Sequence, residues 1–278
     1  IQDFIPPLRE ILEKYQQFQN SLTSAERIFS LMDEPAEQSV RTSELSQNSL
    51  ISIRNLNFRY EETLPLVLKN INLEIPTGQS VALVGRTGSG KSTFISLLQK
   101  FYPSPEGTIF LGDADITHLP QQEVRRHIGV VQQDSFIFRG TIRDNIGLRD
   151  PRISEDTIHQ ACIKSGYWSL LKKSGRDLNS PVEERGSNLS VGERQLISFA
   201  RILAFDPEIL ILDEATANID SESELIIQNA TAEVTKNRTS IIIAHRLSTI
   251  QKCDCIVVLD KGEIIEKGSH EELMANLG

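Results

Sequence analysis

A single stretch, Val81 to Leu98, constrains the fold of this 278-residue chain more than any other, and it reads VALVGRTGSGKSTFISLL. Its first four residues are apolar and predict a buried strand, and apolar residues at helical spacing resume after a glycine-rich turn. Between them, Gly85, Gly90, Lys91 and Ser92 match the pattern G-x-x-x-x-G-K-S/T. Glycines let the backbone curl around a polyphosphate, so that N–H groups and the helix start point at negative oxygens. The stretch therefore predicts a phosphate-binding loop.

The side chains of this loop have separate expected roles. Lys91 supplies a mobile positive charge for the outer phosphates, and the Ser92 hydroxyl is placed to ligate Mg²⁺. A purely structural Gly/Ser-rich loop is the alternative, and the strand before it and the helix after it disfavour that alternative. We expect the rest of the loop and the helix start to contact the nucleotide as well, namely Gly85, Arg86, Thr87, Gly88, Ser89, Gly90 and Thr93.

Charge and composition narrow the function classes. The formal net charge is −9, from 29 basic and 38 acidic side chains, and no long basic run occurs. A general nucleic-acid binder should show a clustered basic face, so we expect no nucleic-acid partner. The three cysteines fit no disulfide framework, and no run of about 18 apolar residues is present to span a bilayer. We therefore expect this chain, taken alone, to be soluble.

The chain is expected to fold as an α/β protein in three parts. Residues 1–34 carry apolar side chains at three- and four-residue steps, which predicts an amphipathic helix. Its apolar stripe needs a partner, either the domain itself or a preceding transmembrane segment. Residues 35–48 are polar and predict a linker. Residues 49–278 form the globular domain, with antiparallel strands before the phosphate loop, a mostly parallel core and a helical subdomain at about 135–205.

Polar side chains follow several buried strands. Asp213 and Glu214 end the apolar run Ile209 to Leu212, at the position where open α/β sheets bind ligands. Asp213 can hold Mg²⁺, and Glu214 can accept a proton from the attacking water. Gln132 follows another apolar strand and could reach the metal or the water, although a lone glutamine is usually structural. His245 ends a further strand and could orient the terminal phosphate, or be an ordinary residue at a strand end.

Two other features each allow two interpretations. Ser190 and Glu193 form a capping box before a helix, and capping alone would account for them. The alternative is that the free N–H groups of this helix start bind phosphate. Tyr60 precedes the core at what resembles a strand end, where it could stack on a purine ring or be a half-buried strand tyrosine. The residues themselves leave the first question open, and without the rest of the pattern they favour the half-buried strand tyrosine for Tyr60.

The order of these motifs resembles that of the nucleotide-binding domain of ATP-binding cassette (ABC) transporters, over residues 49–278. The matching segments are the Walker A loop at 85–92, the Q-loop at 130–134, the signature LSVGERQ at 189–195, the Walker B strand at 209–214, the D-loop at 215–220 and the H-loop at 244–246. Two further segments are similar to those of ABC exporters. Segment 20–35 is similar to the cytoplasmic end of an exporter's last transmembrane helix, and segment 136–146 is similar to the region that follows the Q-loop in exporters. Pro181 departs from the exporter pattern, which has an acidic residue there.

The resemblance assigns roles to individual residues. It implies that Glu214, His245 and Gln132 are catalytic, and that Tyr60 stacks on adenine. Nucleotide contacts would also come from the signature and the D-loop, through Ser190, Gly192 and Asp220. Magnesium would be held by Ser92, Gln132 and Asp213.

The resemblance also implies an activity and partners. We expect an ATPase that uses ATP and Mg²⁺ and couples hydrolysis to substrate export across a membrane. Two nucleotide-binding domains would sandwich two ATP molecules in a homodimer, with a heterodimer as the alternative. The transmembrane domain of the same polypeptide would be the second partner and would place the domain at the cytoplasmic face of the cell (inner) membrane. A soluble ABC ATPase acting on nucleic acid or ribosomes is the alternative function, and these residues do not identify a transported substrate.

Overall fold

The chain divides into two compact units, residues 1–40 and 41–278. The computed structural model describes residues 5–33, 50–132, 135–214, 221–244 and 247–275. The first unit contains the helix α1 (Ile5–Asp33), which confirms the predicted helix and buries none of its side chains. Its exposed apolar residues include Phe18 and Phe29. Within the described ranges, no helix is both long enough and apolar enough to cross a bilayer.

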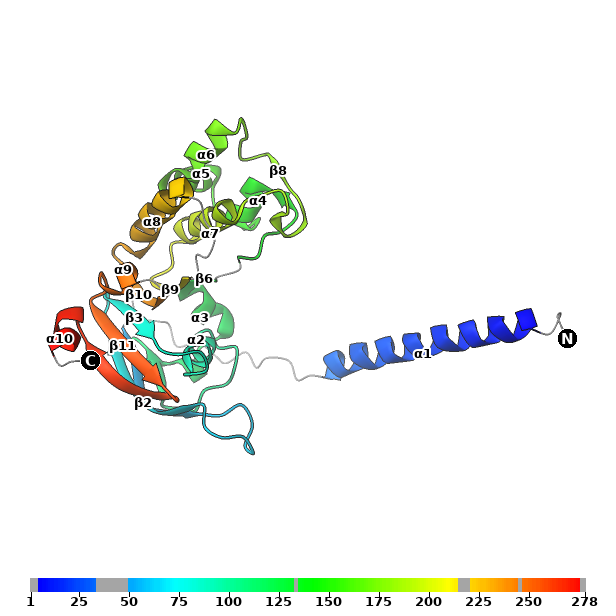
Figure 1. The fold of residues 1–278 in the computed structure, drawn as a ribbon, viewed down its shortest axis with the longest axis horizontal. Helices are drawn as coiled ribbons and strands as arrows, with labels where there is room; N and C mark the ends of the chain where they lie inside the picture. Colours follow the sequence, from blue (N-terminus) through cyan, green and yellow to red (C-terminus); the bar gives the residue numbers. More distant parts are fainter. Residues whose placement is uncertain (1–4, 34–49, 133–134, 215–220, 245–246, 276–278) are drawn as a thin grey trace. The chain divides into compact units, whose positions relative to one another are not determined.

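A six-stranded sheet forms the centre of the second unit, and its strand order is β12-β11-β3-β10-β9-β6. Neighbouring strands from β11 to β6 run parallel, and only β12 pairs antiparallel at the edge. This arrangement confirms the predicted α/β class with a mostly parallel core (Figure 1). The strands are β3 (Ser80–Val84), β6 (Ile128–Val131), β9 (Ile209–Glu214), β10 (Thr239–Ala244), β11 (Cys255–Asp260) and β12 (Glu263–Gly268).

A smaller antiparallel sheet, in the order β2-β1-β4-β5, confirms the strands predicted ahead of the phosphate loop. Its strands, with the short helices that follow the loop, are β1 (Ile51–Phe58), β2 (Leu68–Ile75), α2 (Lys91–Leu98), β4 (Ile109–Leu111), β5 (Ala114–Asp115), the 3₁₀ helix η2 (Ile116–His118) and α3 (Gln121–His127).

The central strands are buried on both faces, and their alternate residues enter two different cores. In β9, Ile209 and Ile211 pack with α2 and the antiparallel sheet, whereas Leu210 and Leu212 pack with the helices of the other face. This is why the run has no alternation of apolar and polar residues. Because these elements cover the two faces of the sheet, a ligand can bind at the carboxyl ends of its parallel strands, as in other open α/β sheets.

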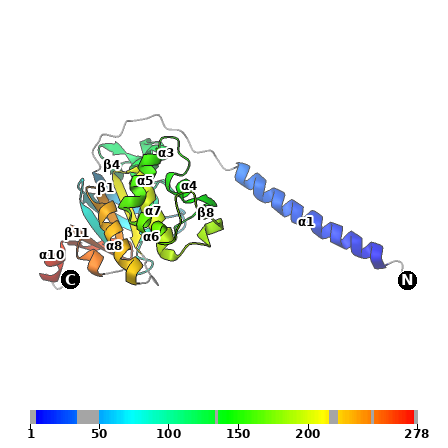
Figure 2. The same ribbon diagram turned by 90° about the horizontal axis from the view of Figure 1, so that it is seen from above.

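Helices gather on one face of the sheet, and Figures 1 and 2 show α4, α5, α6 and α7 together with α8. Two strands of two residues each also lie in this region; they are too short to leave a periodic signal in the sequence. The elements are β7 (Gly140–Thr141), α4 (Ile142–Gly147), α5 (Glu155–Lys164), α6 (Tyr167–Lys173), β8 (Pro181–Val182), the 3₁₀ turn η3 (Glu184–Gly186), α7 (Val191–Phe205) and α8 (Ser221–Thr235). The chain ends with α9 (Leu247–Ile250), the hairpin of β11 and β12, and α10 (His270–Ala275).

Candidate functional site

The phosphate loop joins β3 to α2 and depends on its glycines. Gly85, Gly88 and Gly90 all have positive φ angles, of 155°, 81° and 108°. A Cβ at Gly85 would lie 2.2 Å from the carbonyl oxygen of Leu259, so no larger residue fits without movement of the backbone. Gly90 caps α2 without any side-chain hydrogen bond. The first N–H groups of the helix therefore have no side-chain partner at the cap and are available to an anion.

Lys91 lies inside the loop that it is expected to serve. Its Nζ donates hydrogen bonds to the carbonyl oxygens of Gly85, at 2.7 Å, and Arg86, at 3.0 Å. Burial lowers the pKa of the ammonium below its ordinary value, and the negative charge of Asp213 acts in the opposite direction. The fold thus brings the loop lysine within electrostatic range of the carboxylate at the end of β9, as a nucleotide site requires.

The hydroxyl group of Ser89 is an unsatisfied polar group within this loop. It is buried and has no hydrogen-bond partner among the residues that the structure describes. The backbone carbonyl of Ser89 accepts a hydrogen bond from the N–H of Gly262, at 3.0 Å. Buried polar groups in proteins are nearly always paired, so an unpaired hydroxyl beside free N–H groups fits a loop that completes its hydrogen bonds with a ligand.

The ends of β6 and β9 bring the other expected residues to the same edge. Val131 pairs with Leu212, so Gln132 and Asp213 follow at equivalent positions of adjacent strands. The Gln132 side chain is exposed and that of Asp213 is half-buried. Together with the exposed Ser92 hydroxyl, they offer amide, carboxylate and hydroxyl oxygens, which are the hard donors that Mg²⁺ prefers.

Three expected residues fall wholly or partly outside the described part of the chain. Glu214 is the last residue of β9, and its backbone lies opposite Ala244 at the end of β10, but its side chain is not described. His245 and Asp220 lie outside the described residues.

Tyr60 lies two residues beyond the end of β1, in an aromatic cluster. Its hydroxyl group is 2.8 Å from that of Thr93 in α2, which ties the ring to the helix after the phosphate loop. The rings of Phe58 and Tyr102 meet that of Tyr60 edge to face, at centroid distances of 5.2 and 4.9 Å. Tyr60 is 44% exposed, so an aromatic surface remains open beside the loop.

The signature segment begins α7 in the group of helices. Ser190 is the N-cap, and its Oγ accepts a hydrogen bond from the N–H of Glu193, at 3.2 Å. The Glu193 carboxylate accepts one from the N–H of Ser190, at 2.9 Å, which confirms the predicted capping box. Ser190 is exposed and Gly192 is buried. Among the described residues, no hydrogen bond or ion pair joins Ser190 to the phosphate loop of its own chain.

Sequence reasoning missed a residue that supports the phosphate loop. Gly262, in the turn between β11 and β12, donates to Ser89 and has a φ of 84°. A Cβ there would lie 2.1 Å from the carbonyl oxygen of Val67. The Lys-Gly pair in a hairpin indicated a turn, but its contact with a loop far away in the sequence could not be inferred.

Sequence reasoning also missed the anchoring of α7. Arg201 donates to the carbonyl oxygens of Asn145, at 2.9 Å, and Phe136, at 3.3 Å. Burial lowers the pKa of its guanidinium to about 10. The fully buried Asn145 in turn bonds to the N–H and carbonyl of Phe138, at 2.8 and 2.9 Å. These contacts join the signature helix to the segment after β6, and no local pattern in the sequence signals them.

These features define a P-loop nucleotide-binding domain. The glycine-rich loop joins a buried parallel strand to a helix whose N-cap has no side-chain hydrogen bond, the lysine lies against the loop, and a carboxylate lies at a nearby strand end. Residues 68–217 match the family model described as ABC transporter. The chain belongs to the ABC transporter family. It is the ATP-binding domain, an ABC-type ATPase, and the predictions of ATP as the nucleotide and of this family are confirmed.

Curated proteins and a solved structure agree with this assignment. The chain is 47% identical, over 97% of its length, to YheH of Bacillus subtilis, a probable multidrug resistance ABC transporter ATP-binding/permease protein. It is 40% identical, over 97% of its length, to the leukotoxin export ATP-binding protein LtxB of Aggregatibacter actinomycetemcomitans. These matches cover 40% and 38% of the two relatives. A bacterial Atm1-family ABC exporter with ATP bound superposes with a TM-score of 0.82 at 34% identity, over 95% of this chain and 46% of that one.

Proposed function

We propose that this chain is the ATP-hydrolysing motor of an exporter and that two copies close around two Mg-ATP molecules. The observation that carries the proposal is that no bond among the described residues joins the phosphate loop to the cap of α7, the two surfaces at which we expect anions to bind. The phosphate loop lies on the sheet, and the exposed cap of α7 lies in the group of helices, with no described bond between them. Each surface supplies only part of a nucleotide site, so a second copy provides the missing half.

Within one site, this chain's residues would divide the work. Lys91 and the loop N–H groups hold the phosphates, and Tyr60 provides the surface for the adenine ring. Ser190 and Gly192 of the second copy cover the terminal phosphate, with Asp220 at the same interface. Such fixed donors stabilise the charge that develops during phosphoryl transfer.

Magnesium would fit the oxygen donors at the start of α2 and at the ends of β6 and β9. Ser92, Asp213 and Gln132 would hold the ion, which would neutralise phosphate charge. Glu214 would accept the proton of the attacking water, a role worth about 10²–10⁴ in rate. His245 would orient that water and the terminal phosphate.

Coupling to transport would require a membrane domain. YheH is named as an ATP-binding/permease protein, and this chain spans less than half the length of each of the relatives above. We infer that the partner is a transmembrane domain of the same polypeptide, that the motor works at the cytoplasmic face of a membrane, and that closure and reopening of the two copies drive export.

The Glu214→Gln variant tests the proposal, because it keeps the binding groups and removes the general base. Size-exclusion chromatography with light scattering should give a monomer without nucleotide and a dimer with Mg-ATP. Steady-state hydrolysis should fall by about 10²–10⁴. Adding Lys91→Ala to this background should abolish the dimer. A monomer under both conditions contradicts the sandwich, and unchanged hydrolysis contradicts the role of Glu214.

A further inference from the structure

The signature turn carries a negative charge at the position where the proposed function requires an anion to bind. Glu193 is the third residue of α7, and its carboxylate lies in the capping box with Ser190. The N-terminus of a helix stabilises a carboxylate and a phosphate for the same reason, because both are negatively charged. The two groups would therefore compete for the same N–H groups and repel each other. A site built to receive the terminal phosphate needs this charge to be neutralised.

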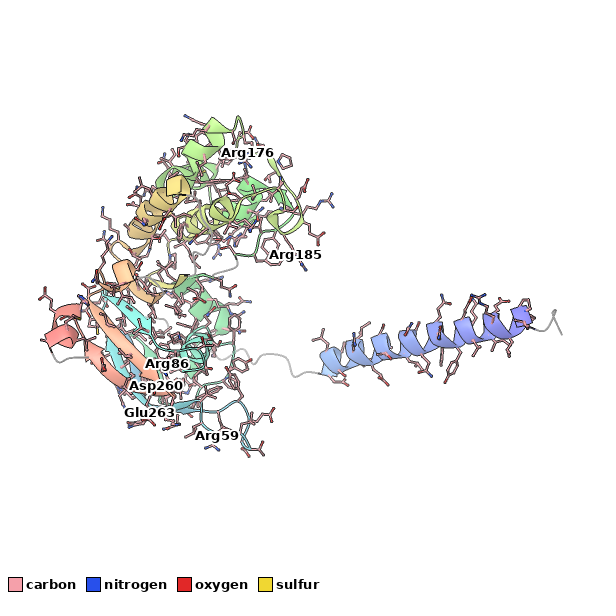
Figure 3. The ribbon with its side chains drawn as sticks, viewed as in Figure 1. Arg59, Arg86, Arg176, Arg185, Asp260 and Glu263 are labelled. Atoms are coloured by element: carbon pink, nitrogen blue, oxygen red, sulfur yellow. The ribbon has the colours of Figure 1, made fainter. Side chains whose placement is uncertain are left out.

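Arg176 supplies the neutralising charge from another element. It follows α6 and comes from the turn before β8, and it is labelled in the group of helices in Figure 3. Its guanidinium forms an ion pair with Oε1 of Glu193, and the side chains are only 29% and 13% exposed. Its Nε also donates to the hydroxyl of Ser174, at 3.0 Å, which fixes the orientation of the guanidinium.

Each carboxylate oxygen of Glu193 therefore has a hydrogen-bond partner. Oε1 faces Arg176, and Oε2 accepts the hydrogen bond from the N–H of Ser190. The neighbouring cation, Arg194, donates instead to the carbonyl oxygen of Leu189, at 2.8 Å. Arg176 thus forms an ion pair with the same carboxylate that accepts the hydrogen bond from the N–H of Ser190.

A buried tyrosine, Tyr167, lies near enough to Arg176 and Glu193 to interact electrostatically with both. Tyr167 is fully buried, and its hydroxyl has no hydrogen-bond partner within the described ranges. Burial raises the pKa of Tyr167, the negative charge of Glu193 raises it further, and the positive charge of Arg176 acts in the opposite direction. In such surroundings an unpaired carboxylate is costly, so loss of Arg176 would leave Glu193 to turn toward water or toward the bound phosphate.

We propose that Arg176 is a positioning residue for ATP held by a second copy of this chain. It neutralises Glu193 and fixes the orientation of Ser190, so that the start of α7 can accept the terminal phosphate of the partner's nucleotide. This inference rests on the proposed function. It assigns a part in ATP capture to a residue outside the motifs of the family.

The test uses the Glu214→Gln chain as parent and compares four further variants with it. They are Arg176→Gln, Arg176→Lys, Glu193→Gln and the double variant Arg176→Gln/Glu193→Gln. Two quantities are measured: the affinity of the monomer for a fluorescent ATP analogue, and the ATP concentration that gives half-maximal dimer by light scattering. Lys172→Gln is the matched control, because it removes a positive charge from α6 without touching Glu193.

Arg176→Gln should leave the affinity of the monomer unchanged and raise the ATP concentration for half-maximal dimer by at least about tenfold. Arg176→Lys should lie between this variant and the parent. The double variant should recover to within about threefold of Glu193→Gln, because glutamine keeps the capping bond and carries no charge. Recovery of the double variant separates the charge effect from misfolding of the single variant.

The outcomes distinguish the two proposals. If the parent dimerises with ATP and Arg176→Gln does so at the same concentration, the role of Arg176 is wrong and the proposed function stands. A double variant as impaired as Arg176→Gln would also overturn that role. If the parent does not dimerise, the proposed function fails and the role of Arg176 fails with it.

Discussion

The hydroxyl groups of Tyr60 and Thr93 lie 2.8 Å apart and connect the loop after β1 to the first turn of α2. The aromatic cluster around Tyr60 is thereby tied to the helix after the phosphate loop, although the two segments follow strands of different sheets. Because Tyr60 lies outside the phosphate loop, substitutions at Tyr60 can separate the contribution of the adenine base to ATP affinity from the contribution of the phosphates.

Replacing Tyr60 by alanine should weaken ATP binding and spare the binding of inorganic tripolyphosphate. Loss of base stacking is worth about 1–3 kcal/mol, or about 5- to 150-fold in affinity. Tyr60→Phe keeps the stacking surface and should bind ATP within about threefold of the parent. Isothermal titration calorimetry with both ligands checks this. An equal loss for both ligands would show that Tyr60 acts on the phosphate loop and not on the base.

Lys91→Ala should lower the affinity for ATP by about 10- to 150-fold, because a charge-assisted hydrogen bond to phosphate is lost. The present partners of Lys91 are backbone carbonyls of the loop, which water can satisfy once the ammonium is gone. The free energy of unfolding should therefore change little. Nucleotide titration and urea denaturation measure the two effects. The exposed Lys164→Ala is the control and should change neither; ATP binding by Lys91→Ala at the affinity of the parent would refute the role of the lysine.

Gly262→Ala should destabilise the domain and also weaken ATP binding. The added Cβ would lie 2.1 Å from a backbone oxygen, and the contact that supports Ser89 would be displaced. Gly78→Ala is a matched control, because its φ of 80° imposes a similar backbone cost and its Cβ would meet nothing within 4 Å. We expect Gly262→Ala to cost about 1–3 kcal/mol more than the control in urea denaturation. If Gly262→Ala and Gly78→Ala lowered the free energy of unfolding equally, the turn at Gly262 would be able to shift away from Val67, and its proposed support of Ser89 would be contradicted.

Asp144 should make the stability of the helical region depend on pH. Hydrogen bonds from Arg149 and from the N–H of Thr141 lower the pKa of its carboxyl from 3.8 to about 2. Because the pKa is lower in the folded state, the stabilisation is present above pH 4 and is lost as the pH falls toward 2. Asp144→Asn should therefore be less stable than the parent at pH 7, and the difference should shrink below pH 4.

Urea denaturation at a series of pH values measures this difference. Asp113→Asn, at an exposed aspartate in the turn between β4 and β5, is the control and should differ little from the parent at any pH. A gap between Asp144→Asn and the parent that stays constant from pH 7 to pH 3 would contradict the assignment.

Local patterns predicted much of the fold and part of the site. The phosphate loop, the strands covered on both faces and the capping box of Ser190 each rest on residues that are neighbours in the chain, so their spacing reports their structure. Contacts between distant residues left no such signal. Arg201 meets Asn145 across 56 positions, and Arg176 meets Glu193 across 17. Their pairing depends on how helices pack, which no local spacing encodes.

The sequence by itself determined the family, because the order of its motifs resembles that of a known family. It also determined the nucleotide-binding loop and the alternation of strands and helices, because these follow from short-range sterics and hydrophobic periodicity. Only the tertiary structure decided that Lys91 lies within range of Asp213, that Gly262 supports Ser89, and that Arg176 neutralises Glu193. The reason is physical: hydrogen bonds need contact distances, screened electrostatic interactions weaken over about 10 Å, and folding brings these groups together from separate parts of the chain.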